Sequence, residues 1–204
     1  MYNPKHFQVD DLAELHAMLE QFSFATLVTQ HDGAPFATHL PLQLDRSRGP
    51  LGALIGHVSR ANPQWQHLAA GQPALAIFQG PHAYISPSWY RSAPNVPTWN
   101  YLAAHATCAA RIVDDPAEQQ AMLARLVDSN EAGFEHPWRM DLPDDYMDRM
   151  LRGIVGFELA IERLEGKHKL SQNRSADDRA GVVAALAHSP DPLAASVGDL
   201  MSEG

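Results

Sequence analysis

The order of the strand-like and helix-like segments is the feature that most constrains how this chain can fold. Residues 23–30 and 36–44 both alternate in the manner of strands, and Asp32-Gly33 between them is a dipeptide typical of a β-hairpin turn. A third strand is predicted at residues 51–58, after a turn rich in Ser, Gly and Pro. This succession is not the strand–helix alternation of a doubly wound fold.

The rest of the chain continues this pattern. Further strands are predicted at residues 74–78, 83–85, 99–113 (one long strand or two bent ones) and 153–164. Helices are predicted at residues 9–22, 63–70, 115–129, 143–151 and around Val182 and Leu186. Strands in hairpin order with helices at the ends predict an α+β fold on an antiparallel sheet or barrel.

Length and composition favour one folded domain. A chain of 204 residues should bury roughly 70% of the surface that its unfolded form exposes, which is enough for one sizeable core. The 45% of hydrophobic residues exclude a mainly disordered chain. We therefore expect one domain over residues 1–188. The tail, residues 189–204, contains a Pro-Asp-Pro break and is expected to be either mobile or a short helix.

Two further features concern location. No apolar run is long enough to span a membrane, so we expect no membrane association. The first six residues, Met-Tyr-Asn-Pro-Lys-His, lack the charged-then-apolar layout of a signal peptide, and the expected location is therefore the cytoplasm.

The charge is distributed unevenly. The formal net charge of −9 argues against a nonspecific nucleic-acid binder, because phosphate neutralisation needs clustered cations. Residues 46–113, however, contain no Asp or Glu, where average usage would place about eight. This stretch is either a strand-rich core that avoids carboxylates or a site for an anionic ligand. Its five arginines are Arg46, Arg48, Arg60, Arg91 and Arg111.

The segment from Gly56 to Trp65 joins a predicted strand end to a predicted helix start. Backbone N–H groups at a helix start attract anions, and Ser59, Arg60 and Asn62 add side-chain donors. Arg60 could pair with a phosphate through two hydrogen bonds. The alternative is a capped turn with Arg60 on the surface.

Two other segments could contribute to a site. Three of the four tryptophans lie between Trp65 and Trp99, where they could form the walls around a flat aromatic ligand or belong to an ordinary core or dimer interface. Residues 167–174 are cationic and carry amide and hydroxyl donors; alone, they are typical of a solvated loop.

Known catalytic signatures are absent. The sequence has no Gly-x-Gly-x-x-Gly, Walker, His-Glu-x-x-His or Gly-x-Ser-x-Gly motif, and its histidines show no metal-ligand spacing. The single cysteine, Cys108, excludes a disulfide framework and a thiolate zinc site, and is expected to be buried and structural. No catalytic residue and no metal site are assigned.

Five motifs together resemble one family. They are His39-Leu40-Pro41-Leu42, the segment from Gly56 to Trp65, the segment from Phe78 to Tyr90, Val96-Pro97-Thr98-Trp99-Asn100-Tyr101 and Lys169-Leu170-Ser171-Gln172-Asn173-Arg174. In this sequence order they resemble the PaiB family, whose members are called FMN-binding negative transcriptional regulators. The resemblance extends over residues 1–187.

The resemblance implies a fold, a cofactor and an assembly. The fold would be the antiparallel FMN-binding split β-barrel with peripheral helices, and the protein would be a homodimer with FMN at the dimer interface. The phosphate would be held by the strand-to-helix turn, and the strand with His39 and Leu40 would lie along the flavin ring. The cofactor-binding residues it implies are His39, Leu40, His57, Val58, Ser59, Arg60, Asn62, Trp65, Trp99, Asn100, Lys169, Ser171, Gln172 and Asn173.

Two functions remain open from the sequence, and a third possibility is that the cleft holds another cofactor or none, which would leave a plain dimeric scaffold. One is an FMN-binding transcriptional regulator, although the absence of a recognisable helix-turn-helix and the net charge of −9 argue against direct DNA binding. The other is a flavin-dependent oxidoreductase linked to NAD(P)H, with His39 or His57 as a general acid by residue type only.

Overall fold

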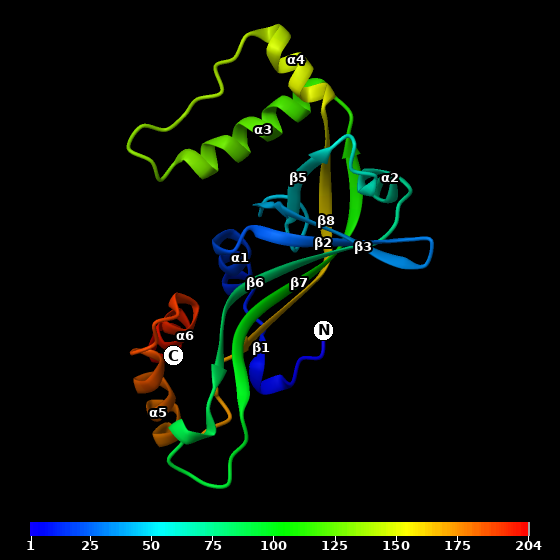
Figure 1. Ribbon diagram of the computed structural model, residues 1–204. Coiled ribbons are helices and arrows are strands. Elements are labelled where there is room, and N and C mark those ends of the chain that lie inside the picture. The colour runs from blue at the N-terminus through cyan, green and yellow to red at the C-terminus, as the bar shows by residue number, and fades with distance from the viewer. Residues whose placement is uncertain (204) are drawn as a thin grey trace. The chain divides into compact units, whose positions relative to one another are not determined.

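Eight strands form one open sheet in the computed structural model, which describes residues 1–203. The strand order is β3-β2-β6-β7-β8-β5-β4, and β1 pairs with β8 outside this path. The pairs β1–β8, β2–β3, β2–β6, β4–β5 and β5–β8 are antiparallel. The strands, which can be followed in Figure 1, are β1 Gln8–Val9, β2 Phe24–His31, β3 Ala34–Pro41, β4 Gln43–Asp45, β5 Ala53–Ser59, β6 Ala74–Ile85, β7 Thr98–Val113 and β8 Ile154–Lys169.

Helices connect and cover these strands. They are the α-helices α1 Leu12–Gln21, α2 Gln64–Ala69, α3 Pro116–Glu131, α4 Asp144–Arg152, α5 Ala176–Leu186 and α6 Pro192–Glu203, and the 3-10 helices η1 Lys5–Phe7 and η2 Pro87–Trp89. The chain divides into two compact units. Unit 1 contains residues 1–18, 78–105 and the chain from Glu165; unit 2 contains residues 19–77 and 106–164.

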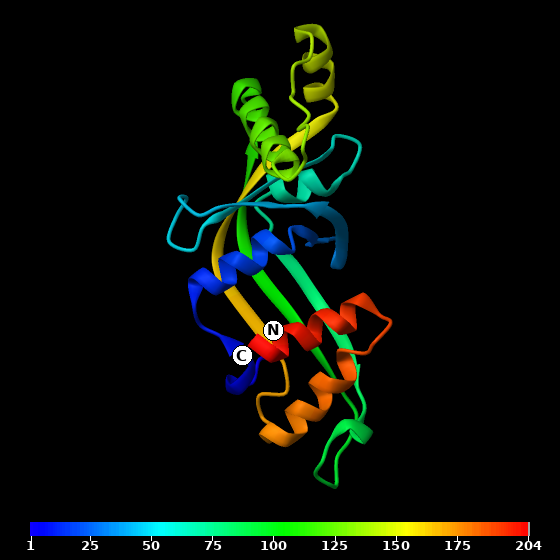
Figure 2. The same cartoon turned by 90° about the vertical axis from the view of Figure 1, so that its left-hand side faces the viewer.

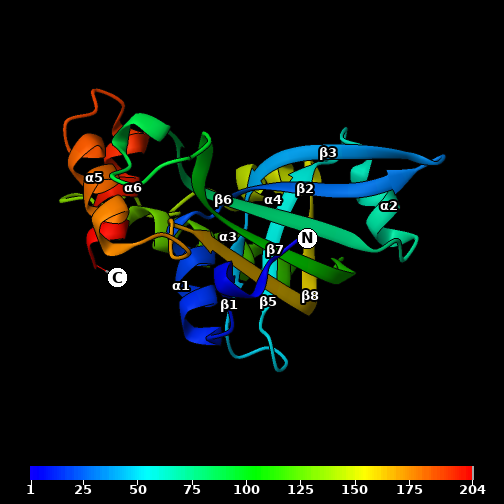
Figure 3. The same ribbon diagram turned by 90° about the horizontal axis from the view of Figure 1, so that it is seen from below.

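The β2–β3 hairpin of unit 2 confirms the prediction made from Asp-Gly. Asp32 and Gly33 have φ angles of 50° and 77°, the left-handed backbone that a tight hairpin turn requires. The register runs from Phe24 opposite Pro41 to His31 opposite Ala34. Helix α2 packs beside this hairpin (Figure 3), so the turn that leads into α2 lies close to β3.

The β5–β8 ladder of unit 2 positions the end of β5. It pairs Ala53 with Ala160 at one end and Ser59 with Ile154 at the other. Gly56 sits where space is short, because a Cβ there would lie 2.7 Å from Leu42 Cδ2. This close packing fixes β5 and hence the start of the turn that follows Ser59.

Unit 1 has its own apolar core, formed between strand residues and the last two helices. Ile85, Val182, Leu186 and Val197 are almost fully buried there. Helices α5 and α6 pack against each other on the unit 1 part of β6 (Figure 2). Residues 192–203, for which a mobile tail or a short helix was expected, therefore form a helix.

Two strand predictions were wrong in extent. Residues 74–78 and 83–85 were expected as separate strands, but they belong to one strand, β6. Gly80 and Pro81 are consecutive residues and both are buried, which shifts the inside–outside alternation by one residue. The strand nevertheless continues through them. The last strand continues to Lys169, so the first residues of the basic segment 167–174 lie in β8 rather than in a loop.

Candidate functional site

The turn between β5 and α2 holds Arg60 in place through main-chain oxygens. The Arg60 N–H donates to Gly153 O at 2.9 Å, and its guanidinium donates from Nε to Arg152 O at 2.8 Å and from Nη2 to Ile154 O at 2.9 Å. These oxygens lie beside Arg60 because Ser59 pairs with Ile154 in the β5–β8 ladder. The exposed guanidinium is thus oriented, and its Nη1 donors have no partner among residues 1–203.

Backbone N–H groups of this turn were expected to be free to bind an anion, but three of them form hydrogen bonds within the turn. Asn62 N–H donates to Ser59 O at 2.9 Å, Ala61 N–H to Ser59 Oγ at 3.3 Å, and Gln64 N–H to Asn62 Oδ1 at 3.0 Å. Asn62 Nδ2 also donates to Thr38 Oγ1 at 2.9 Å, which ties the turn to β3. The side chains of Ser59 and Arg60 remain as donors for an anion at the turn.

Two buried polar side chains, which were not predicted from the sequence, fix α2 to the β2–β3 hairpin. The fully buried Gln64 Nε2 donates toward Leu27 O at 2.9 Å, Thr29 Oγ1 at 3.2 Å and Phe36 O at 3.3 Å. His67 Nδ1 lies 2.9 Å from Thr29 Oγ1. The available signal was the three-residue spacing of Gln64 and His67, which places both on one face of a helix.

The predicted flavin-ring residues of β3 differ in exposure. His39 is exposed, and its Nδ1 lies 3.0 Å from Thr26 Oγ1 on the neighbouring strand. Leu40 is buried, at 5% exposure, and belongs to the core of unit 2. Of this pair, only His39 therefore presents its side chain to solvent.

Three further predicted residues lie at or near the same turn. His57 is half-buried, and burial lowers the pKa of its imidazole, which favours the neutral form. Val58 is buried. Trp65 Nε1 donates to Arg60 O at 3.1 Å and so supports the turn from the helix side. Unit 2 thus brings together the predicted residues from β3, β5 and α2.

The side chains of Asn100 and Ser171 in unit 1 form hydrogen bonds with each other. Asn100 is fully buried, and its Nδ2 donates to Ser171 Oγ at 2.9 Å and contacts Met201 Sδ at 3.3 Å. Ser171 is buried too and has a left-handed φ of 63°. The carboxamide of Asn100 is therefore engaged inside unit 1, with β7, α6 and the segment after β8.

The other predicted residues of unit 1 lie nearer to solvent. Trp99 is 52% exposed and meets Tyr84 edge-to-face, with ring centroids 5.9 Å apart. Lys169 donates to Thr98 Oγ1. Gln172 is held by its own segment, because its Nε2 donates to His168 O at 2.6 Å and its Oε1 accepts from the N–H of Leu170. Asn173 is exposed.

Ion pairs cancel much of the positive charge of residues 46–113. Carboxylates neutralise three of the five arginines of this stretch: the pairs are Arg46–Glu20, Arg48–Asp45, Arg48–Glu158, Arg111–Glu118 and Arg111–Glu158. Arg60 is different, since none of the residues that the structure describes offers it a carboxylate. Of the arginines in residues 46–113 that belong to unit 2, Arg60 is therefore the one whose guanidinium is exposed, oriented and not paired with a carboxylate of the described residues.

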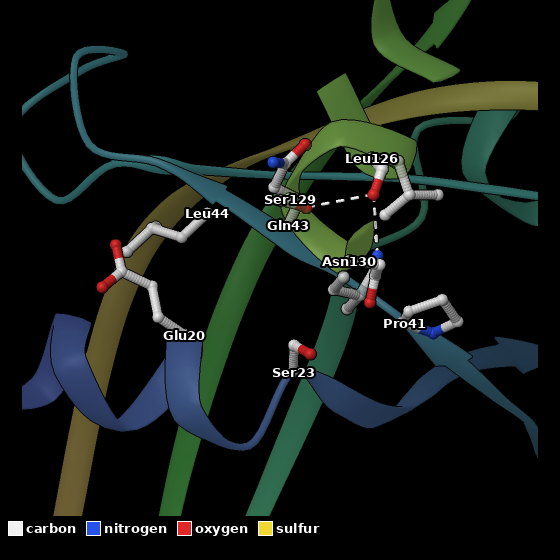
Figure 4. Close-up of a pocket in the computed structure, with 9 residues that line it drawn as sticks. Glu20, Ser23, Pro41, Gln43, Leu44, Leu126, Ser129 and Asn130 are labelled. Carbon is white, nitrogen blue, oxygen red and sulfur yellow. Dashed lines mark hydrogen bonds between the residues drawn. The ribbon is translucent and has the colours of Figure 1, made fainter. Parts of the chain in front are cut away.

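A cavity of about 380 Å³ lies elsewhere in unit 2, between the end of α1, β4 and α3 (Figure 4). Its lining mixes leucines with polar groups, and the buried Gln43 Oε1 has no hydrogen-bond partner. Ser129 Oγ and Asn130 Nδ2 both donate to Leu126 O at its edge. No residue predicted to bind the cofactor lines this cavity.

Cys108 fits the structural interpretation. Its side chain is buried, and burial raises the pKa of the thiol to about 12. Within residues 1–203, no cluster of three or more His, Cys, Asp or Glu side chains could hold a metal ion. None of the helices described is long and apolar enough to cross a membrane.

Sequence comparisons identify a family and a relative that are similar to this chain. The family described as "Putative FMN-binding domain" matches residues 1–163. The Bacillus subtilis (strain 168) protein called Protease synthase and sporulation protein PAI 2 is 38% identical over 206 residues, covering 100% of this chain and 97% of that protein.

Structural comparisons bear on the fold alone. The FAD and heme binding protein from Mycobacterium smegmatis aligns with a TM-score of 0.62 at 20% identity, covering 87% of this chain and 79% of that chain. The flavocytochrome Anf3 from Azotobacter vinelandii aligns with a TM-score of 0.63 at 18% identity, covering 85% and 75%. They confirm the predicted α+β split-barrel architecture. The matched family model and the full-length relative together show that this chain belongs to the PaiB family of FMN-binding-domain proteins.

Proposed function

We propose that this protein is an FMN-binding protein of the PaiB type and that the turn between β5 and α2 holds the phosphate of FMN. The observation that carries the proposal is the exposed guanidinium of Arg60, which is anchored by two main-chain oxygens and has no carboxylate partner among the residues described. An anchored guanidinium with free donors suits a phosphate, because it loses little freedom on binding.

The chemistry of the donor set fits an anionic flavin. The Ser59 hydroxyl adds a donor beside Arg60, and the surrounding stretch of residues 46–113 contributes no carboxylate that would repel a phosphate. His39, Leu40, His57, Val58, Asn62 and Trp65 are proposed to complete this part of the site. Bound FMN would supply the redox chemistry, while these residues bind and orient it.

The remaining parts of the proposal rest on family membership. Trp99, Asn100, Lys169, Ser171, Gln172 and Asn173 are proposed as further cofactor-binding residues, and the protein is proposed to be a homodimer with FMN at the interface. The regulatory role carried by the family name would then depend on flavin binding. A net charge of −9 argues that such regulation does not act through direct contact with DNA.

A flavin-dependent oxidoreductase is the second candidate. The solved structures that share the fold include a protein titled a flavocytochrome, and the half-buried His57 would be a neutral imidazole near neutral pH. NAD(P)H oxidation by the FMN-loaded protein would favour this function, whereas no turnover with either nicotinamide would leave the regulator as the better proposal.

Absorbance of the purified protein tests FMN binding directly. We expect bands at about 375 and 450 nm, either as isolated or after incubation with FMN and removal of the excess. Saturable quenching of FMN fluorescence gives the affinity of protein isolated without cofactor. A protein that shows neither bands nor quenching does not bind FMN, and the proposal fails.

A further inference from the structure

We propose that Thr38 is a positioning residue of the FMN site. Its hydrogen bond with Asn62 holds the turn between β5 and α2 at a fixed distance from β3, and the preference of the protein for FMN over riboflavin, the flavin without a phosphate, depends on this bond. The inference deepens the proposed function and rests on it in one respect, namely that the turn with Arg60 takes the FMN phosphate.

The two elements that this hydrogen bond joins lie far apart in the order of the sheet. β3 is the first strand of the order β3-β2-β6-β7-β8-β5-β4, and β5, which leads into the turn, is the last but one. The two strands contact each other, yet no backbone ladder joins them within residues 1–203. Side chains therefore have to fix the turn relative to β3.

Asn62 uses both ends of its carboxamide for this purpose. Its Nδ2 donates to Thr38 Oγ1 at 2.9 Å, and its Oδ1 accepts from the Gln64 N–H at 3.0 Å. One end thus holds β3 and the other holds the start of α2. Thr38 and Asn62 are both half-buried, so water competes less for their hydrogen bond than it would at an exposed pair.

Thr38 connects the two parts of the proposed site. His39, the next residue on β3, is exposed, and this strand is proposed to lie along the flavin ring. The turn on the other side of the hydrogen bond carries Arg60, which is proposed to hold the phosphate. FMN would bind through both parts and must match their separation, whereas riboflavin, without a phosphate, would use the strand alone.

The other attachments of the turn act in different directions. Arg60 is anchored to Arg152 O and Ile154 O, so its guanidinium is oriented relative to β8. Among the residues described, the turn at residues 60–62 makes no other side-chain hydrogen bond to β3. Loss of the Thr38 hydroxyl would leave the guanidinium anchored but free the turn relative to β3. The effect on FMN should therefore be smaller than the effect of losing Arg60.

The Kd values of FMN and riboflavin, both measured by fluorescence quenching, test this role. Thr38→Val removes the hydroxyl at nearly unchanged shape, and we expect it to raise the Kd of FMN about fivefold, as for the loss of one neutral hydrogen bond. The Kd of riboflavin should change by less than about twofold. Thr38→Ser, which keeps the hydroxyl, should restore the preference for FMN. If Thr38→Val does not fold, Thr38→Ala makes the same comparison.

Thr107 offers a matched control in unit 2. It is a half-buried strand threonine, and its Oγ1 accepts a hydrogen bond from Arg163 Nη2 at 3.3 Å. Thr107→Val should leave both Kd values unchanged. A second control is the double variant with Arg60→Ala. Because Thr38 acts through the turn, Thr38→Val should change the Kd of FMN little further once the guanidinium is gone.

The outcomes separate this inference from the proposed function. An unchanged Kd of FMN in Thr38→Val overturns the inference, and so does an equal weakening of FMN and riboflavin, which indicates a general structural role. A full further loss in the Arg60→Ala background also overturns it. In these cases the proposed function stands, provided that the wild type prefers FMN and Arg60→Ala weakens it. A wild type that binds no FMN, or binds riboflavin equally well, overturns the proposed phosphate turn and this inference together.

Discussion

Arg60 shows how one side chain can be oriented for a ligand by the main chain. Its guanidinium uses two donors on Arg152 O and Ile154 O and keeps others for solvent or a ligand. Arg46 is also exposed, yet its guanidinium pairs with Glu20 at 2.6 Å. These two arginines therefore form a natural test pair.

Replacing Arg60 with Ala should weaken FMN binding by about 1.5–3 kcal/mol, the range for a charged hydrogen bond. This corresponds to roughly a tenfold to 150-fold higher Kd. Fluorescence-quenching titrations measure the effect, with Arg46→Ala as the control that should leave the Kd unchanged. Equal affinities for wild type and Arg60→Ala would remove Arg60 from the site.

Asp178, which lies on α5, attaches that helix to the segment after η2 within unit 1. Its carboxylate accepts from the N–H groups of Arg91 and Ser92 at 2.7 and 2.9 Å and from the Ser92 hydroxyl at 2.6 Å. These hydrogen bonds, with that from Ser92 Oγ the strongest, lower the pKa of Asp178 to about 2.

A carboxyl whose pKa is lowered on folding stabilises the folded state above its unfolded pKa and loses that contribution as the pH falls. For Asp178 the loss should occur between about pH 4 and pH 2. Urea unfolding at a series of pH values measures it. The Asp178→Asn variant should be less stable at pH 7 and should lack this part of the acid dependence; an unchanged pH profile would contradict the assignment.

At the scale of elements, α2 depends on a polar rather than an apolar attachment. Gln64 is fully buried and donates to acceptors on both strands of the β2–β3 hairpin. A buried acceptor left without its donor costs free energy, so the short helix is sensitive to this residue.

Gln64→Leu should lower the free energy of unfolding by about 1–3 kcal/mol, since the oxygens of Leu27 and Phe36 lose a donor. Urea denaturation is the measurement. Gln66, which is exposed on the same helix, gives the matched control, and Gln66→Leu should change stability by less than about 0.5 kcal/mol. Similar effects of the two changes would mean that Gln64 does not anchor α2.

Elements were predictable where local chemistry decides them. Asp32-Gly33 indicated the hairpin, and Asp115-Pro116 indicated the start of α3, where the Asp115 carboxylate accepts the Glu118 N–H. The extent of β6 was not predictable, because Gly80-Pro81 is typical of a turn. Only tertiary packing, which buries both residues, continues the strand there.

At the scale of the whole molecule, charge counted along the chain differs from charge in space. Arg46 and Arg111 belong to the acid-free stretch, but Glu20 and Glu158, which pair with them, lie 26 and 47 residues away. The sequence therefore identified the turn between β5 and α2 as a candidate phosphate site from residue types, but it overstated the positive charge around this turn. Nor could it show that Asn100 is engaged by Ser171 and Met201, since these contacts join distant segments.

Nonspecific DNA binding should be absent at physiological salt. Salt-dependent affinity for duplex DNA comes from cations that replace counter-ions on phosphates, and this chain has 15 Lys and Arg against 24 Asp and Glu. Fluorescence anisotropy with a random-sequence duplex at about 0.15 M salt should show no saturable change. Saturable binding that weakens steeply with salt would contradict this and revive direct DNA contact.

The anchoring of Arg60 has a consequence for how sequences of this kind can diverge. Because the acceptors are main-chain oxygens at 152 and 154, the anchor does not depend on which side chains occupy these positions. Substitutions there can accumulate in related chains without loss of the anchor. Insertion or deletion of a single residue between α4 and β8 would move both oxygens, so we expect the length of this connection to be kept even where its residues drift.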